Sequence, residues 1–320
     1  MSKLKIIGGS GFIGTNFIDN FKNDYDITIL DIRDSQSYPM MYEYCDIRDK
    51  NMLKACLQPD DIVINLAAEH HDDVSPSDRY YETNSIGAKN LSEVAREKGI
   101  SKIVFTSTVA VYGLSDDPKS EESPTVPFNH YGKSKLMAEK HYIDWQSECN
   151  TDLVIIRPTA IFGPGNKGNV YNLFNQIARN RFIMISKGEN IKSVGYIDNI
   201  SHFIRTCLRA SKNTSEIYNF VDKPDLTTSE LVSLVKSCLN RNGSKLYIPY
   251  WLAYGIGLLF DLFGQITARK FIISSIRIKK FCSSTIIECN SSPKDYKQVI
   301  SLEDGISKTI DSDFRNFISN

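Results

Sequence analysis

A glycine-rich stretch near the start of the chain, GGSGFIG (Gly8–Gly14), limits the possible folds more than any other feature of the sequence. It follows the apolar run Leu4–Gly8 and opens a helix-like segment, Phe12–Phe21. Its glycines fit both GxGxxG and GxxGxxG, and small residues there let the backbone turn sharply and approach a pyrophosphate. A helix N-terminus then offers free N–H groups to the phosphates. A glycine-rich surface turn would show the same letters, but the strand before it and the helix after it favour a phosphate-binding loop.

The first half of the chain alternates short apolar runs with longer amphipathic segments. The apolar runs, rich in Ile and Val, are expected strands: Leu4–Gly8, Asp26–Asp31, Asp61–Ala68, Ser101–Ser107 and Thr151–Pro158. The segments between them are expected helices: Phe12–Phe21, Lys50–Leu57, Arg79–Lys98 and Tyr131–Cys149. Nearly continuous apolar strands are typical of parallel sheets covered on both faces. The alternation therefore predicts an α/β fold, a Rossmann-type doubly wound parallel sheet.

After about Gly163 this alternation loosens, and Pro and Gly become more frequent. We expect a dinucleotide-binding domain over residues 1–163 and a smaller, mixed substrate-binding region over residues 164–320. Because such folds often return strands from the second region to the main sheet, we expect some segments after residue 163 to do so.

The composition is that of an ordinary globular protein. Lys+Arg and Asp+Glu both number 38, so the chain lacks the basic surface that general nucleic-acid binding requires. The seven cysteines are scattered without a CxxC pair, which favours reduced thiols over disulfides or a zinc site. The N-terminal apolar run is too short for a signal peptide, and no segment reaches the ~18 apolar residues of a membrane span. We expect a cytoplasmic protein.

Asp31 ends the second expected strand, 17 residues after Gly14. A carboxylate at this place binds ribose hydroxyls in dinucleotide folds and repels the 2′-phosphate of NADP, so we expect NAD. Arg33, two residues on, leaves NADP as an alternative, and a plain turn residue is another interpretation of Asp31. Asp46 and Ile47 are placed to flank the adenine, although an ordinary strand end would look the same.

Tyr131 and Lys135 are four residues apart on an expected helix and therefore lie on one face of it. A tyrosine, with an ordinary pKa near ~10, is a poor base at neutral pH. We expect the nearby ammonium to lower the pKa of Tyr131, so that the pair acts as a general acid and base beside a hydride carrier. A surface pair would show the same spacing. However, Ser107 and Thr108 end the fourth expected strand, at the sheet edge where α/β folds bind ligands.

Several motifs together resemble the extended short-chain dehydrogenase/reductases, and more narrowly their nucleotide-sugar epimerase/dehydratase branch. The motifs are GGSGFIG, Asp31, NLAA (Asn65–Ala68), Asn84, TSTVAVYG (Thr106–Gly113), YGKSK (Tyr131–Lys135) and RPTAIFGPG (Arg157–Gly165). The resemblance covers most of the chain and implies that Thr108, Tyr131 and Lys135 are catalytic. The residues expected to bind the cofactor are Gly8, Gly11, Phe12, Ile13, Gly14, Asp31, Asp46, Ile47, Leu66, Ala67, Ala68, Asn84, Thr106, Ser107, Tyr131, Lys135 and Pro158.

The same resemblance narrows the reaction. Family members that dehydrate sugars carry an acidic pair directly after the catalytic threonine, whereas this chain has Val109 and Ala110, which cannot transfer a proton. A 4-epimerisation, in which hydride leaves and returns, or a net reduction therefore remains. Longer matches, among them Leu66–Asn84 and Ser274–Thr285, resemble the subgroup of 4-epimerases that act on N-acetylglucosamine diphospho-undecaprenol in O-antigen assembly. His71 departs from the subgroup's pattern, which has arginine there.

The resemblance and the loop positions place the sugar and its diphosphate near His70, Thr108, Asn169 and Lys192. Lys192 stands where UDP-sugar epimerases usually hold an arginine; it keeps the charge without the bidentate fork, and a surface lysine is the alternative. The run AEHHDDV (Ala68–Val74) holds two His and three carboxylates. Consecutive residues cannot all face one ion, and no second cluster has zinc spacing, so we expect no metal.

The segment Trp251–Phe260 is almost without polar groups but is too short to span a bilayer. One interpretation is a buried helix of the C-terminal region. The other is a segment that lies on an anionic membrane surface, which the basic residues after it would favour. These residues are Arg269, Lys270, Arg277, Lys279 and Lys280. A lipid-linked substrate would require the second interpretation, with the enzyme peripheral on the cytoplasmic face of the membrane.

Three functions remain open. The first is an NAD-dependent 4-epimerase of a lipid-linked diphospho-sugar, with a UDP-sugar 4-epimerase as its nearest alternative. The second is a nucleotide-sugar reductase or dehydrogenase, which would consume nicotinamide stoichiometrically. The third, a non-catalytic dinucleotide sensor, is disfavoured because a sensor has no need of the Tyr131–Lys135 pair. The resemblance also implies a homodimer formed by two-helix packing.

Overall fold

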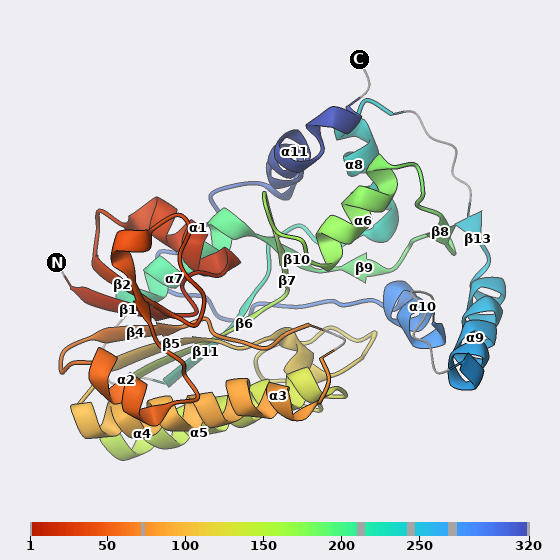
Figure 1. The fold of residues 1–320 in the computed structure, drawn as a ribbon. Helices are drawn as coiled ribbons and strands as arrows, with labels where there is room; N and C mark the ends of the chain where they lie inside the picture. The colour runs from red at the N-terminus through yellow and green to blue at the C-terminus, as the bar shows by residue number, and fades with distance from the viewer. Residues whose placement is uncertain (1, 72–73, 210–214, 242–246, 268–273, 319–320) are drawn as a thin grey trace.

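A seven-stranded sheet forms the centre of the structure, a computed structural model that describes all residues except 1, 72–73, 210–214, 242–246, 268–273 and 319–320. The strand order is β11-β6-β5-β4-β1-β2-β3, and every pair is parallel (Figure 1). The strands are β1 (Lys3–Ile7), β2 (Asp26–Asp31), β3 (Tyr42–Tyr44), β4 (Ile62–Asn65), β5 (Lys102–Thr106), β6 (Asp152–Pro158) and β11 (Ser215–Phe220). The expected doubly wound parallel sheet is confirmed.

Helices cover both faces of this sheet. One face carries α2 (Lys50–Cys56), α4 (Gly87–Lys98) and α5 (His130–Cys149), and the other carries α1 (Phe12–Phe21) and α7 (Ile197–Arg209) (Figure 1). Successive strand residues point to opposite faces. Ile6 accordingly belongs to the same buried cluster as Phe17 of α1, whereas Ile7 belongs to the cluster of Leu91 of α4. Both faces need apolar side chains, which explains why the strands are apolar without interruption.

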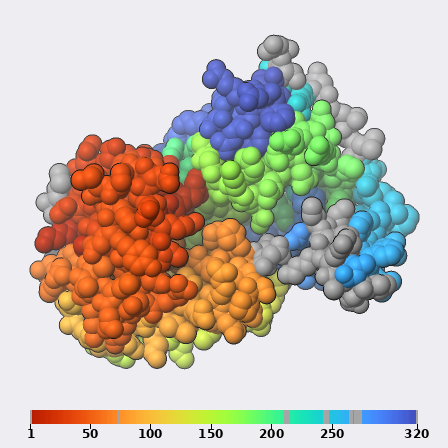
Figure 2. Space-filling view, in the orientation of Figure 1, coloured from red at the N-terminus to blue at the C-terminus, as the bar shows by residue number. Residues whose placement is uncertain are grey.

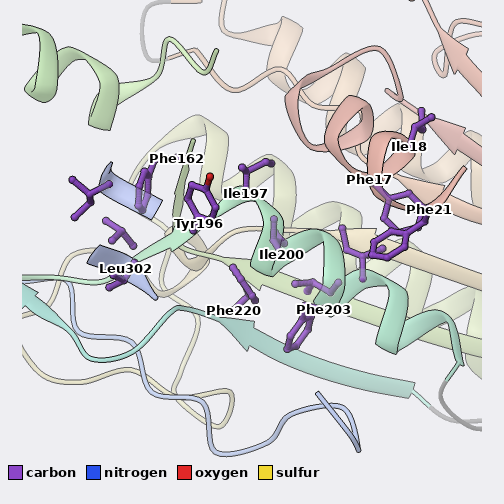
Figure 3. Packing of buried hydrophobic residues seen from close by; sticks show 14 of the residues in the cluster. Phe17, Ile18, Phe21, Phe162, Tyr196, Ile197, Ile200, Phe203, Phe220 and Leu302 are labelled. Carbon is purple, nitrogen blue, oxygen red and sulfur yellow. The ribbon is translucent and has the colours of Figure 1, made fainter. Parts of the chain in front are cut away.

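The later part of the chain extends the core of the α1 face. Its elements are α6 (Asn169–Ala178), α8 (Thr228–Cys238), α11 (Leu302–Asp313) and the two-stranded pairs β7 (Ala160–Phe162) with β10 (Val194–Tyr196), β9 (Ile191–Lys192) with β12 (Leu226–Thr227) and β8 (Met184–Ile185) with β13 (Tyr247–Ile248). Phe17 and Phe21 of α1 belong to the same buried cluster as Phe203 of α7, Phe220 of β11 and Leu302 of α11 (Figure 3). The expected return of a strand to the main sheet is confirmed by β11, while the domain border at residue 163 stays a prediction.

The expected helices and strands agree with the structure except at their ends and in one helix. The segment expected as a single helix over 79–98 consists of α3 (Asp78–Tyr80), a π-helical segment (Tyr81–Ile86) and α4. Asn84, one of the expected cofactor-binding residues, lies in the π-helical segment. Single π-helical turns inside α-helices are often found at functional sites.

Two helices, α9 (Tyr250–Thr267) and α10 (Ser275–Cys282), pack against each other at one end of the molecule (Figures 1 and 2). Trp251–Phe260, the apolar stretch of the sequence, lies in α9, and several of its large side chains are exposed. The interpretation as a fully buried helix is therefore wrong for the chain by itself. Within the described residues, no helix combines the length and apolar character needed to cross a membrane. Arg269 and Lys270 lie outside the described residues.

Candidate active site

The glycine loop between β1 and α1 is closely packed in a way that only glycine permits. Gly8 has φ +77°, and a Cβ there would lie 2.5 Å from the backbone nitrogen of Ala67. A Cβ at Gly14 would lie 2.5 Å from the carbonyl oxygen of Gly9, so the first turn of α1 rests on the loop. Gly11 caps α1 without a side-chain hydrogen bond. The N–H groups of the first turn, including those of Phe12 and Ile13, are thus not capped by a side chain and suit a pyrophosphate.

Asp31 lies directly beside this loop, at the end of β2. Its Oδ2 accepts a hydrogen bond from the Ser10 N–H at 3.1 Å, and its Oδ1 accepts one from the Arg33 N–H at 3.0 Å. An ionised carboxylate can accept about four hydrogen bonds, so capacity remains for two ribose hydroxyls. The structure therefore brings together the expected phosphate and ribose contacts. This arrangement fits a dinucleotide whose ribose has free hydroxyls, which is NAD.

Asp46 and Ile47 follow β3, and the neighbouring Cys45 N–H donates to the carbonyl of Asp31 at 3.1 Å. The Arg48 guanidinium contacts both carboxylate oxygens of Asp46, and its hydrogen bonds hold the pKa of that carboxyl below its ordinary value. Ile47 is buried, and a Cβ at Gly87 would touch its side chain. Both residues lie at the expected edge of the sheet, and their contact with adenine stays a prediction.

The loop after β4 closes the site from the other side. Leu66 N–H donates to the Ile7 carbonyl at 2.8 Å, and Ala67 N–H donates to the Asn65 side chain at 3.0 Å. Ala68 follows in the same loop, and Thr106 of the next strand donates to the Asn65 carbonyl at 3.2 Å. These contacts hold the loop against the phosphate loop.

Asn84 connects this loop to the helix that carries Tyr131. Its side chain accepts from the Glu69 N–H at 2.8 Å and donates to the Ser134 hydroxyl at 2.9 Å. Ser134 precedes Lys135 in α5, so Asn84 helps fix the position of that helix. A direct contact of Asn84 with the cofactor stays a prediction.

Tyr131, Lys135 and Thr108 come together at the carboxyl end of β5. Asn129 caps α5 by accepting the Gly132 N–H at 2.8 Å, which places Tyr131 in the first turn. The Thr108 hydroxyl is hydrogen-bonded to the Tyr131 phenol. It also accepts the Ala110 N–H at 3.2 Å, which fixes its direction.

The protonation of this pair differs from the expectation. Burial raises the pKa of Tyr131 to about 12, and the hydrogen bond from Thr108 offsets only part of that rise. We expected Lys135 to lower this pKa, and that prediction is wrong for the chain alone. Lys135 is itself buried, with its ammonium 4.2 Å from the centre of the Phe105 ring. Burial lowers the pKa of Lys135 to about 7, against the attraction of Glu139.

Sequence reasoning missed a buried polar chain beneath the catalytic residues, made of Ser107, Glu139, Arg157, Tyr112 and Asn219. Ser107 donates to Glu139 at 2.5 Å, and Arg157 donates to both oxygens of Glu139 at 3.0 and 2.6 Å. Arg157 also donates to Tyr112 at 2.9 Å, and Tyr112 donates to Asn219 at 2.8 Å. The available signal was that Glu139 is one helical turn beyond Lys135. Pro158, the expected nicotinamide contact, follows Arg157 and is buried at the end of β6.

The residues expected to bind substrate are less closely grouped. His70 stacks on His71 with ring centres 4.6 Å apart and lies within electrostatic reach of Lys135. Asn169 is exposed at the N-terminus of α6.

Lys192, the fourth of them, is held by α10. Its ammonium donates to the carbonyls of Lys280 at 3.0 Å and Ser283 at 2.5 Å, and burial lowers its pKa to about 8. Two of its three N–H groups are therefore used within the chain, and its contact with a diphosphate stays a prediction. Among the described residues, which omit Asp72 and Asp73, no three His, Cys, Asp or Glu side chains are grouped to hold a metal ion.

The comparison with known proteins agrees with this geometry. Residues 4–220 match the NAD dependent epimerase/dehydratase family. The N-acetyl-alpha-D-glucosaminyl-diphospho-ditrans,octacis-undecaprenol 4-epimerase of Escherichia coli O157:H7 is 41% identical over 97% of this chain and 94% of its own length. The chain therefore belongs to the NAD dependent epimerase/dehydratase family.

Other known proteins are similar at lower identity. UDP-glucose 4-epimerase of Vibrio cholerae is 28% identical over 85% of this chain and 84% of its own length. The crystal structure of the Bacillus cereus UDP-glucuronic acid 4-epimerase in complex with NAD superposes with a TM-score of 0.75. It is 17% identical and covers 98% of this chain and 99% of that one. The expected family and its NAD dependence are confirmed.

Proposed function

We propose that this chain is an NAD-dependent sugar 4-epimerase that interconverts N-acetylglucosamine and N-acetylgalactosamine on diphospho-undecaprenol. The observation that carries the proposal is the grouping of Tyr131, Thr108 and Lys135 beside a dinucleotide loop. The carrier is inferred from the E. coli relative, which is named for a diphospho-undecaprenol substrate and matches nearly the whole chain. The product would enter the assembly of O-antigen or another surface polysaccharide.

In the proposed reaction, Tyr131 takes the proton of the C4 hydroxyl and later returns it. Thr108, which is hydrogen-bonded to the phenol, would bond the same C4 oxygen in this proposal. NAD+, held by the phosphate loop and Asp31, would supply the hydride acceptor and donor for C4 and a positive charge in the site. Because burial keeps the pKa of Tyr131 high, the phenol needs such positive charge nearby before it can act as a base. Lys135 supplies a second charge when protonated.

The residues after Thr108 support epimerisation over dehydration. Val109 and Ala110 form the first turn of the short 3-10 helix Val109–Tyr112, and neither can exchange a proton with a neighbouring carbon of the sugar. A reductase or dehydrogenase of the same fold remains the alternative. It differs in one measurable respect, because it would consume nicotinamide with each turnover.

The proposal includes the remaining contacts expected from the sequence. His70, Asn169 and Lys192 are the proposed substrate contacts besides Thr108, and the cofactor residues are those of the phosphate loop, Asp31 and the strand ends. We also propose a homodimer, which the exposed apolar side chains Met137 and Ile143 on α5 support. Light scattering that gives twice the 36.2 kDa chain mass would support the dimer, and a single chain mass would contradict it.

A paired assay on purified protein tests the function. One tube contains N-acetylglucosamine diphospho-undecaprenol in detergent and the other UDP-N-acetylglucosamine, each with a trace of NAD+ and no reductant. We expect conversion of the lipid-linked sugar only, and a loss of about 10²–10⁴-fold in rate for Tyr131→Phe, since that variant lacks the acid and base. Conversion of only the UDP-sugar would contradict the lipid carrier. Stoichiometric loss of NAD+ would favour the dehydrogenase.

A further inference from the structure

One face of α9 is apolar and exposed along the described helix. Its large side chains, here called the α9 face, are Trp251, Leu252, Leu258, Leu259, Leu262 and Phe263. At 100° per residue these six positions fall within about one-third to one-half of the helix circumference. Trp251 is 73% exposed and Leu259 57%. Contiguous apolar patches of this kind on a protein surface mark an interaction site.

The opposite face of α9 is already used. Ala253 is buried, and a Cβ at Gly257 would lie 2.8 Å from the backbone of Ser275 in α10. The Ser275 N–H donates to the Asp261 carboxylate at 3.1 Å, and Ile278 of α10 is buried against Gly257. These contacts orient α9 so that its other face points away from α10. The α9 face is thus a fixed feature of the surface.

The charge beside this face is positive. Between Tyr250 and Cys282 the sequence has five basic residues and one acidic residue, Asp261, although the whole chain has 38 of each sign. Within α10, Arg277, Lys279 and Lys280 occur without any carboxylate. Basic residues beside an apolar helix face attract anionic lipid headgroups. The same charges oppose the approach of a second copy of the same segment.

Lys280, in the last turn of α10, contacts two residues on the side of the proposed substrate site. The Lys280 ammonium lies 5.0 Å from the centre of the Phe128 ring, and Phe128 precedes Tyr131 by three residues. The carbonyl of Lys280 accepts a hydrogen bond from Lys192, the proposed diphosphate contact. α10 therefore connects the α9 helix with Phe128 and with Lys192.

We propose that the α9 face and the basic residues of α10 dock the enzyme on an anionic phospholipid bilayer. In this position the polyprenyl chain of the substrate stays in the membrane while its diphospho-sugar reaches Tyr131. The presentation of a lipid-linked substrate to Tyr131 rests on the proposed function. The binding of the protein to the bilayer does not. The α9 side chains enter the interfacial region, and Lys279 and Lys280 contact the lipid headgroups.

The test is flotation of the full-length protein with vesicles of phosphatidylethanolamine and phosphatidylglycerol, and with vesicles of phosphatidylcholine alone. We expect binding to the anionic vesicles that weakens with salt. The double variant Trp251→Glu/Leu258→Glu should bind at least about 100-fold more weakly, because two large apolar side chains no longer enter the bilayer. The matched control is Met40→Glu, since Met40 is 96% exposed and lies in a different part of the chain. It should float like the wild type.

Two further measurements separate a loss of membrane binding from a loss of folding or of self-association. Circular dichroism confirms that the double variant is folded, and light scattering gives its mass. Equal flotation of the folded double variant and the wild type would overturn the proposal, as would a wild type that does not bind vesicles. If the double variant has half the particle mass of the wild type and still binds vesicles, a second copy of the chain covers the α9 face instead. Vesicle binding by an enzyme inactive on both sugars would leave docking standing and contradict the proposed function.

Discussion

The buried polar chain beneath Tyr131 and the α9 face are opposites. In the first, charged and polar groups lie inside the protein, and each makes hydrogen bonds to another part of the same chain. In the second, large apolar side chains are exposed at the surface. Both arrangements are costly for an isolated chain unless something compensates them.

The two regions differ in what offsets the cost of burying charges or exposing apolar side chains. Glu139 and Arg157 compensate each other within the chain, so the acid-base site keeps its geometry without any outside contact. The α9 face is exposed in the chain by itself, and under the proposed docking a bilayer covers it. This division fits the proposed function, in which the acid-base chemistry lies inside the protein and the substrate is held in a membrane. We therefore expect substitutions in the buried polar chain to change the free energy of unfolding strongly. Substitutions on the outer side of α9 should change it little.

The largest effect is expected from Glu139→Gln. Glutamine keeps the shape but removes the charge that compensates Arg157, and a buried ion pair broken in this way costs about 3–5 kcal/mol of unfolding free energy. The control is Glu148→Gln on the same helix, because Glu148 pairs with Arg96 at the exposed surface. That change should cost less than about 1 kcal/mol. Urea unfolding of both variants measures the difference.

Activity provides a second readout for the same pair of variants. Glu139→Gln should lower the turnover rate under folding conditions, because the hydrogen bond from Ser107 helps position the neighbouring Thr108. Equal stability and equal turnover in the two variants would show that the buried chain does not support the site.

A smaller effect is expected for Lys135 and depends on pH. The pKa of Lys135 is about 7 in the folded protein and near ~10.4 in the unfolded chain. Between these values the unfolded state binds the extra proton, so the stability of the wild type rises with pH. Relative to Lys135→Met, the wild type should gain about 2 kcal/mol between pH 7 and pH 9.

The matched variant for this measurement is Lys133→Met, because Lys133 is exposed on the same helix. Its difference from the wild type should stay constant over the same range. Denaturant unfolding at several pH values provides the data. A pH-independent difference for Lys135→Met would mean that this lysine keeps its proton inside the folded protein.

Much of the fold could be predicted from the sequence, because parallel strands buried on both faces leave a strong apolar signal. Among the strands of the main sheet, the exceptions were β3 and β11, which form its two edges. Edge strands need fewer apolar residues, and β11 contains Ser215, Glu216 and Asn219. The expected strand Asp61–Ala68 was too long because Leu66–Ala68 turn away to pack on Gly8.

The site was less predictable where its properties depend on burial. The spacing of Tyr131 and Lys135 indicated their proximity, but spacing does not reveal how far burial raises the pKa of a phenol. Glu139 and Arg157 were missed because their pairing depends on the packing of α5 against β6. The sequence left open whether Trp251–Phe260 is a buried helix or a surface segment, since a helix that is apolar all round is expected to be buried in a core or a membrane.

The smallest effects are expected within α9, where two glycines distinguish its outer and inner sides. A Cβ at Gly255 would meet nothing within 4 Å, so Gly255→Ala should stabilise the helix by up to about 1 kcal/mol. A Cβ at Gly257 would meet Ser275 and Ile278 at 2.8 Å, so Gly257→Ala should push α10 away. Hydrogen exchange should slow in α9 of the first variant and quicken in both helices of the second. Similar exchange in the two variants would mean that α10 does not hold α9 in place, and the α9 face would then lose the fixed orientation on which docking depends.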